Sequence, residues 1–158
     1  MQKLLDKNVY SILHSYDFPH RFYAYFTSQC AKDALSKINN PDPRSLLAVD
    51  IAERYGNGEV FEQKYLEEVY KGASDAAAHA DAYAANAAAN AAYSAAYASA
   101  NADAAAYAAG NAAIAATYAA YATANAAADA TSSNRYKPLL LDLIDKRFSQ
   151  LEKIMLFS

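Results

Sequence analysis

Residues 91–130 read AAYSAAYASANADAAAYAAGNAAIAATYAAYATANAAADA, and this stretch decides the fold that the sequence predicts. Alanine fills 35 of the 58 positions from residue 73 to residue 130. Because alanine is the best helix former, a tract of this composition is expected to be helical rather than disordered. The larger side chains are mostly tyrosine and asparagine, and their spacing indicates how the helix is used.

The tyrosines and asparagines of the tract recur with a heptad period. With Tyr83 at position a, eleven of the twelve tyrosine, asparagine and isoleucine residues from Tyr83 to Asn125 take position a or d. Such a seam is typical of helices that pack through one narrow face. Alanine elsewhere lets the backbones approach closely, while a tyrosine on the seam can bury its ring and pair its hydroxyl. We therefore predict alanine-rich helices packed closely through a Tyr/Asn seam.

An unbroken helix over residues 74–130 would be about 85 Å long, which is too long for a compact domain of this size. We expect a bend or a hairpin near residues 99–103 or at Gly110 and Asn111. Ser99 and Asn101 are both candidates for the N-cap of a second helical segment.

The rest of the chain also has helical spacing, and alternating strand patterns are absent. Asp42 is a candidate N-cap with Pro43 at the first helical position, and the glycines at residues 56–58 are expected to form a left-handed C-cap. We predict one all-α domain over residues 1–158, a compact bundle of about five to seven helices. It divides into short helices (1–72), alanine-rich helices (73–130) and a C-terminal amphipathic helix (136–157).

Composition excludes several classes of protein. The formal net charge of −3 and the pI of about 5.5 do not suggest a nucleic-acid binder. Aspartates and asparagines in the alanine tract make a membrane span costly, and the N-terminus lacks the apolar core of a signal peptide. With Cys30 as its one cysteine, the chain can form no intramolecular disulfide. We expect a soluble, cytoplasmic protein.

No arrangement of residues in the sequence predicts catalysis. Gly56 and Gly58 lack the spacing of a phosphate-binding loop. His14, His20 and Cys30 match no known spacing of metal ligands, and Cys30 on an apolar helical face is expected to be a small core residue. We therefore predict no enzymatic activity, no cofactor and no metal site.

A series of short stretches carries a family resemblance. QCAKDAL (residues 29–35) is followed by NPDPR (40–44), LAVDIAERY (47–55), GNGEV (56–60) and an alanine-rich run containing AHA (78–80). Over roughly residues 22–130 this order resembles the Imm5-like immunity proteins of bacterial polymorphic toxin systems, which also occur in phage genomes. The resemblance implies a non-catalytic protein that binds and neutralises a cognate toxin. Asp42 and Arg44 match the loop of that family, either as a helix cap with a buried or semi-buried ion pair or as a partner contact.

Other functions remain alternatives at this point. They are a phage counter-defence inhibitor of a host defence protein, a self-assembling structural protein in which the seam pairs two chains, and an ice-binding protein. The seam itself is either core or a protein-binding surface, because tyrosines next to alanine make good anchors for a partner. The candidate protein-binding residues are Tyr83, Tyr93, Tyr97, Tyr107, Tyr118, Tyr121, Asp42 and Arg44.

Overall fold

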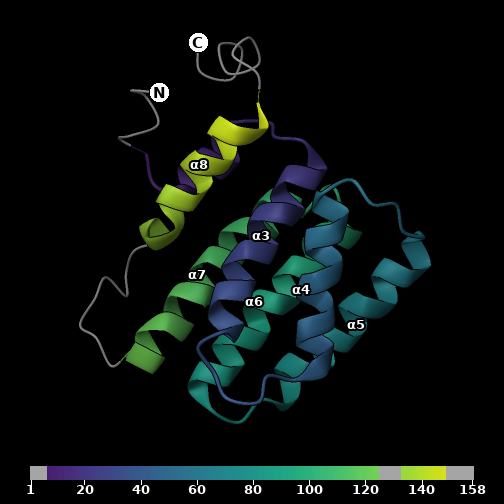
Figure 1. The fold of residues 1–158 in the computed structure, drawn as a ribbon, viewed down its shortest axis with the longest axis vertical. Coiled ribbons are helices and arrows are strands. Elements are labelled where there is room, and N and C mark those ends of the chain that lie inside the picture. Colours follow the sequence, from purple (N-terminus) through teal and green to yellow (C-terminus); the bar gives the residue numbers. More distant parts are fainter. Residues whose placement is uncertain (1–6, 125–132, 149–158) are drawn as a thin grey trace.

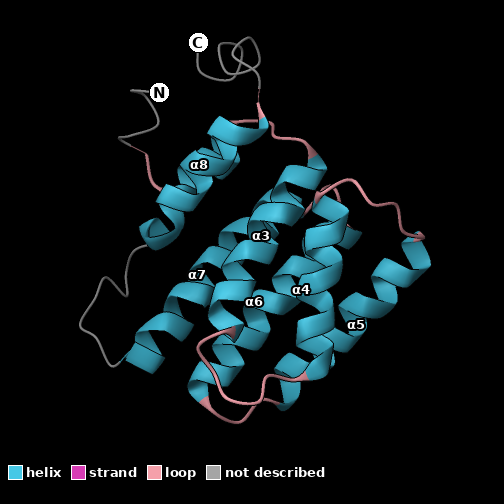
Figure 2. Cartoon of the chain, in the orientation of Figure 1, coloured by secondary structure: helices cyan, strands magenta, loops and turns pink. Residues whose placement is uncertain are grey.

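The computed structural model describes residues 7–124 and 133–148 (Figure 1). In these ranges the chain forms seven α-helices and one short 3-10 helix, with no strand (Figure 2). The predicted all-α bundle of five to seven helices is therefore confirmed. The order of the elements is α2 (Val9–Ser15), α3 (His20–Leu35), α4 (Pro43–Gly56), α5 (Gln63–His79), α6 (Tyr83–Ala100), α7 (Ala105–Ala124), η1 (Ser133–Tyr136) and α8 (Lys137–Arg147).

The start of α4 follows the predicted cap. Asp42 Oδ1 accepts a hydrogen bond from the backbone N–H of Arg44 at 2.8 Å, and Pro43 is the first helical residue. The carboxylate thus satisfies one of the backbone donors that a helix leaves free at its N-terminus.

The end of α4 has the geometry of a Schellman motif. Gly58 has a φ of 103° and donates its N–H to the carbonyl of Tyr55 at 3.0 Å. Glu59 donates its N–H to the carbonyl of Arg54, also at 3.0 Å. A left-handed residue at this point is most easily supplied by glycine. The left-handed glycine of the predicted cap is thus Gly58, whereas Gly56 is the last residue of the helix.

The alanine tract breaks twice. Residues 80–82 separate α5 from α6, a break that the sequence did not predict, and a second break separates α6 from α7 at the first of the two predicted positions. Asn101 Oδ1 accepts the N–H groups of Asp103 at 3.0 Å and Ala104 at 3.2 Å, which turns the chain into α7. Ser99 instead donates its hydroxyl to a carbonyl one turn earlier within α6. Gly110, the alternative position, lies inside α7.

Helix α6 lies at the centre of the bundle. It packs against α3, α4, α5 and α7, and Figure 1 shows α3 and α4 side by side in front of it. The large apolar side chains of the main core come mostly from the helices around the alanine tract. They include Val9, Ile12 and Leu13 of α2, Phe22 and Phe26 of α3, and Leu140, Leu143 and Ile144 of α8.

The face through which α6 and α7 pack is not the predicted one. The buried residues of the two helices are almost all alanines, including Ala88, Ala91, Ala95, Ala109 and Ala112. None of the Tyr/Asn seam residues that the structure describes is buried, and Asn125 lies outside the described residues. The prediction that the seam packs α6 against α7 was wrong because a methyl side chain permits the closest approach of two backbones, whereas a tyrosine ring would hold them apart. In α6 the seam residues Tyr93 and Tyr97 instead pack against α5.

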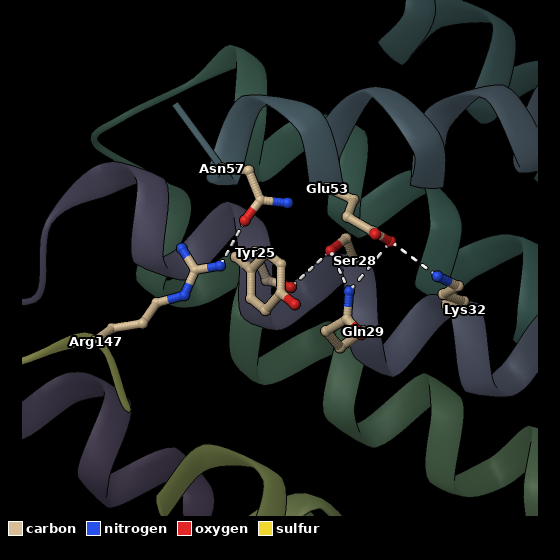
Figure 3. A network of polar contacts seen from close by, with 7 residues as sticks. All are labelled: Tyr25, Ser28, Gln29, Lys32, Glu53, Asn57 and Arg147. Carbon is tan, nitrogen blue, oxygen red and sulfur yellow. Dashed lines mark hydrogen bonds and ion pairs between the residues drawn. The ribbon is translucent and has the colours of Figure 1, made fainter. Parts of the chain in front are cut away.

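Helix α8 is tied to the C-terminal end of α4 by Arg147 (Figure 3). Arg147 donates to the carbonyl of Gly56 at 2.9 Å and to Asn57 Oδ1 at 2.7 Å, and its guanidinium lies 3.7 Å from the ring centroid of Tyr25. The negative end of the α4 dipole also stabilises a cation at this position. Because Phe148 is extended, α8 ends at Arg147, earlier than the predicted residue 157, and residues 149–157 lie outside the described ranges.

A second set of polar contacts joins α3 to α4 (Figure 3). Glu53 Oε2 accepts hydrogen bonds from Gln29 at 3.2 Å and from Lys32 at 3.1 Å. Arg21 of α3 also donates to the carbonyls of Tyr55 and, at 2.9 Å, of Glu59. These contacts fix the C-terminal end of α4 against α3.

Candidate protein-binding surface

One face of α7 carries a row of large side chains that point to solvent. We call it the α7 stripe, and it consists of Tyr107, Asn111, Ile114, Tyr118 and Tyr121. Tyr107 is 58% exposed, Tyr118 and Tyr121 are each 41% exposed, and Ile114 is 38% exposed. The heptad spacing that suggested a seam thus does place these residues on one face, but it is the face opposite the core.

The opposite face of α7 is packed against the bundle, and the α7 stripe itself carries no charge. Alanines on the other side of α7 are buried against the rest of the bundle, as Ala109, Ala112, Ala113, Ala116 and Ala120 show. Helix α7 contains no lysine, arginine, aspartate or glutamate. A solvated helix face normally carries charged side chains, so an uncharged face with three tyrosines is suited to contact with another surface.

Tyr10 of α2 extends this surface beside the α7 stripe. Its ring lies over Gly110, where an added Cβ would come within 3.3 Å of Tyr10 Cδ2. Tyr10 is exposed and also packs against His14, with ring centroids 4.1 Å apart. The sequence contains no signal for this contribution, because Tyr10 and Gly110 are distant along the chain.

The tyrosines of α6 are in a different environment. Tyr93 and Tyr97 are half-buried against Tyr70 of α5, with ring centroids 5.0 Å and 5.1 Å from that of Tyr70. The hydroxyls of Tyr70 and Tyr93 share a hydrogen bond of 2.7 Å. The pKa of Tyr93 is raised to about 12, chiefly by this hydrogen bond and then by burial. These two tyrosines thus join α5 to α6, and Tyr70 is a member of the cluster that the sequence analysis missed.

The remaining candidates lie apart from the α7 stripe. Tyr83 is exposed at the first residue of α6. Arg44 and Asp42 form the expected ion pair of 2.9 Å at the start of α4, with Arg44 exposed and Asp42 half-buried. The hydrogen bond from Arg44, the largest cause, holds the pKa of the Asp42 carboxyl below its usual value. The structure therefore brings Tyr107, Tyr118 and Tyr121 together and separates the other candidates from them.

A cavity of about 470 Å³ lies beside Asp42, at the end of the bundle where α5 ends and α6 begins. Its walls are mostly aliphatic, and His79 and Ser45 also line it. Ser45 is buried, and its hydroxyl has no hydrogen-bond partner among the residues that the structure describes. Because that hydroxyl is buried from solvent, it belongs to the wall of the cavity rather than to its accessible space.

The residues considered as metal ligands are not gathered together. Within residues 7–124 and 133–148 no group of histidine, cysteine, aspartate and glutamate side chains could hold a metal ion. His20 contacts the carbonyl of Ala98 through Nε2 at 2.5 Å and the hydroxyl of Tyr55 through Nδ1 at 2.9 Å. Cys30 lies in the core as expected, and burial raises the pKa of its thiol well above the usual value.

Across the described part of the chain, no helix combines the length and the apolarity needed to cross a membrane. The chain matches no model of a protein family, no curated protein and no solved structure.

Proposed function

We propose that this chain is a non-catalytic, protein-binding inhibitor that neutralises a toxic protein partner, as the resemblance to the Imm5-like immunity proteins implies. The observation that carries the proposal is the α7 stripe. It presents three exposed tyrosines on an uncharged helix face that is held in place by buried alanines.

The physics of protein interfaces supports the use of this surface. Tyrosine is enriched among the residues that contribute most to binding, because a large ring and a hydroxyl are ordered at a low entropic cost. The helix under the rings is already fixed by packing, so little conformational entropy remains to be lost when a partner binds. A counter-defence inhibitor would use the same surface on a host defence protein, and the identity of the partner distinguishes the two functions.

The proposal is tested with the full chain as an affinity bait in a lysate of the host cell. The binding variant is the double substitution Tyr118→Asp/Tyr121→Asp, which places two charges on the α7 stripe. The matched control is Leu47→Asp on α4, where the replaced side chain is 43% exposed and lies off the α7 stripe. Circular dichroism of each variant checks that the fold is retained.

We expect the wild-type chain and Leu47→Asp to capture one protein in stoichiometric amount, and Tyr118→Asp/Tyr121→Asp to lose it. The captured protein should be toxic when it is expressed alone and harmless when it is expressed together with the wild-type chain. Equal capture by the wild-type chain and both variants would exclude the α7 stripe as the binding surface. A captured protein without toxicity, or with a role in host defence, would exclude the immunity function.

A further inference from the structure

We propose that, when no other partner is bound, the α7 stripe binds a second copy of this chain, with the two α7 helices antiparallel across a two-fold axis near Ile114. The inference rests on the proposed function because it uses the same surface. It adds to that function by identifying what covers the tyrosines in the free protein.

The order of residues along the α7 stripe is nearly the same in both directions. Tyr107 and Tyr121 each lie seven residues from Ile114, while Asn111 lies three residues before it and Tyr118 four residues after it. A two-fold axis at Ile114 therefore sets Tyr107 of one copy opposite Tyr121 of the other. The same axis brings Asn111 close to Tyr118 and Ile114 to its own copy. Such self-complementarity is what a two-fold interface requires, because the same patch serves both subunits.

The chemistry of the facing side chains is also compatible. Asn111 offers an amide oxygen that can accept from the Tyr118 hydroxyl, and the amide group can donate in return. One asparagine on an apolar helix face disfavours pairings that leave it without a partner, so it selects one register. Because α7 has no charged residue, two copies of the stripe meet without like-charge repulsion, even though the chain has a net charge of −3.

The area available indicates a weak dimer. With about 200 Å² for each fully buried ring, the exposed fractions of Tyr107, Tyr118 and Tyr121 amount to roughly 300 Å² per copy. Ile114, Asn111 and Tyr10 of α2 enlarge this area. It nonetheless stays below the roughly 800 Å² per partner of a standard stable interface. The second copy would therefore exchange rapidly and give way to a partner that binds more tightly, which is consistent with the proposed function.

The test is site-directed disulfide crosslinking of the full chain. Cys30 is buried, so an introduced cysteine is the reactive thiol in each variant. Ile114→Cys places the thiol next to the two-fold axis, and Leu47→Cys is the control at a similarly exposed position. Under mild oxidation we expect Ile114→Cys to form a covalent dimer roughly tenfold faster than Leu47→Cys, because pairing raises the effective concentration of its thiols.

The direction of the two helices is tested with a mixture of two single-cysteine variants. We expect Tyr107→Cys mixed with Tyr121→Cys to crosslink to each other faster than either crosslinks to itself. Preferential self-crosslinking of each variant would overturn the antiparallel arrangement. Equal rates for Ile114→Cys and Leu47→Cys would overturn the second copy as the occupant.

Sedimentation over a range of concentrations provides an independent readout. The weight-average mass of the wild-type chain should rise with concentration, and that of Tyr118→Asp/Tyr121→Asp should stay at the monomer value. A wild-type monomer at every concentration, or a dimer that survives these substitutions, would contradict the inference. Neither result affects the outcome of the capture experiment that tests the proposed function. A failure of the dimer proposal can therefore be distinguished from a failure of the proposed function.

Discussion

The contact between α4 and α3 at Gly56 makes a sharp prediction about stability. A Cβ added at Gly56 would lie 2.6 Å from Tyr25 Cβ and 2.8 Å from both the Cα and the backbone nitrogen of Tyr25. These atoms belong to the backbone and first side-chain atom of a residue inside α3, so no rotation of a flexible side chain can relieve the overlap. The substitution Gly56→Ala therefore forces α4 and α3 apart.

The magnitude follows from two opposed effects. Alanine is more favourable than glycine in a helix by up to about 1 kcal/mol. Overpacking of a well-packed interior costs roughly 1–3 kcal/mol, and a backbone contact belongs at the upper end of this range. We expect Gly56→Ala to lower the free energy of unfolding by about 2 kcal/mol. The hydrogen bond from Arg147 to the Gly56 carbonyl should weaken as well, because the carbonyl moves with α4.

The matched control is Gly72→Ala in α5. The nearest atom to a Cβ at Gly72 is Arg44 Cβ at 3.8 Å, which is an ordinary contact. We expect Gly72→Ala to raise the free energy of unfolding by roughly 0.5–1 kcal/mol. Urea denaturation followed by circular dichroism gives both values by linear extrapolation. If Gly56→Ala were neutral or as stabilising as Gly72→Ala, the close approach of α4 to α3 would be refuted.

Four further predictions concern single side chains. Tyr70→Phe removes the hydrogen bond that raises the pKa of Tyr93 to about 12 from 10.0, so the pKa of Tyr93 followed by NMR should fall toward 10.0. In the wild-type chain the free energy of unfolding should decrease from pH 10 to about pH 12, because unfolded tyrosine ionises before folded Tyr93; a flat dependence would contradict this. Ser45→Ala should stabilise the fold by about 1 kcal/mol in urea denaturation, because it removes a buried hydroxyl that has no partner in the described part of the chain; a loss of stability would reveal a further hydrogen bond. Tyr136→Phe should lower the free energy of unfolding by about 1.5–3 kcal/mol, since Tyr136 is buried and donates to Asp33 Oδ2 at 2.8 Å; a change near zero would show that this hydrogen bond contributes nothing.

The helices and several of their ends could be predicted from the sequence, because these features depend on near neighbours in the chain. The break at residues 80–82 and the end of α8 at Arg147 were not predicted. Asp42 and Pro43 form the start of α4 as predicted, and Asn101 turns the alanine tract into α7. Heptad spacing also placed Tyr107, Tyr118 and Tyr121 on one face, because residues seven apart in a helix share a side whatever surrounds them. These predictions required no knowledge of the contacts between helices.

Which side of α7 meets the core depends on the packing of helices that lie far apart in the sequence. The usual expectation that large apolar side chains face inward places the tyrosines in the core, but the bundle buries the alanines instead. The neighbouring helices decide this choice, since α3 packs against both α6 and α7, and its Phe22 and Phe26 share one buried cluster with the alanines of these helices. A local pattern defines two faces of a helix, but the space left by helices distant in sequence selects the one that is buried. For the same reason, the contacts of Tyr10 with Gly110 and of Arg147 with the end of α4 appear only in the folded chain.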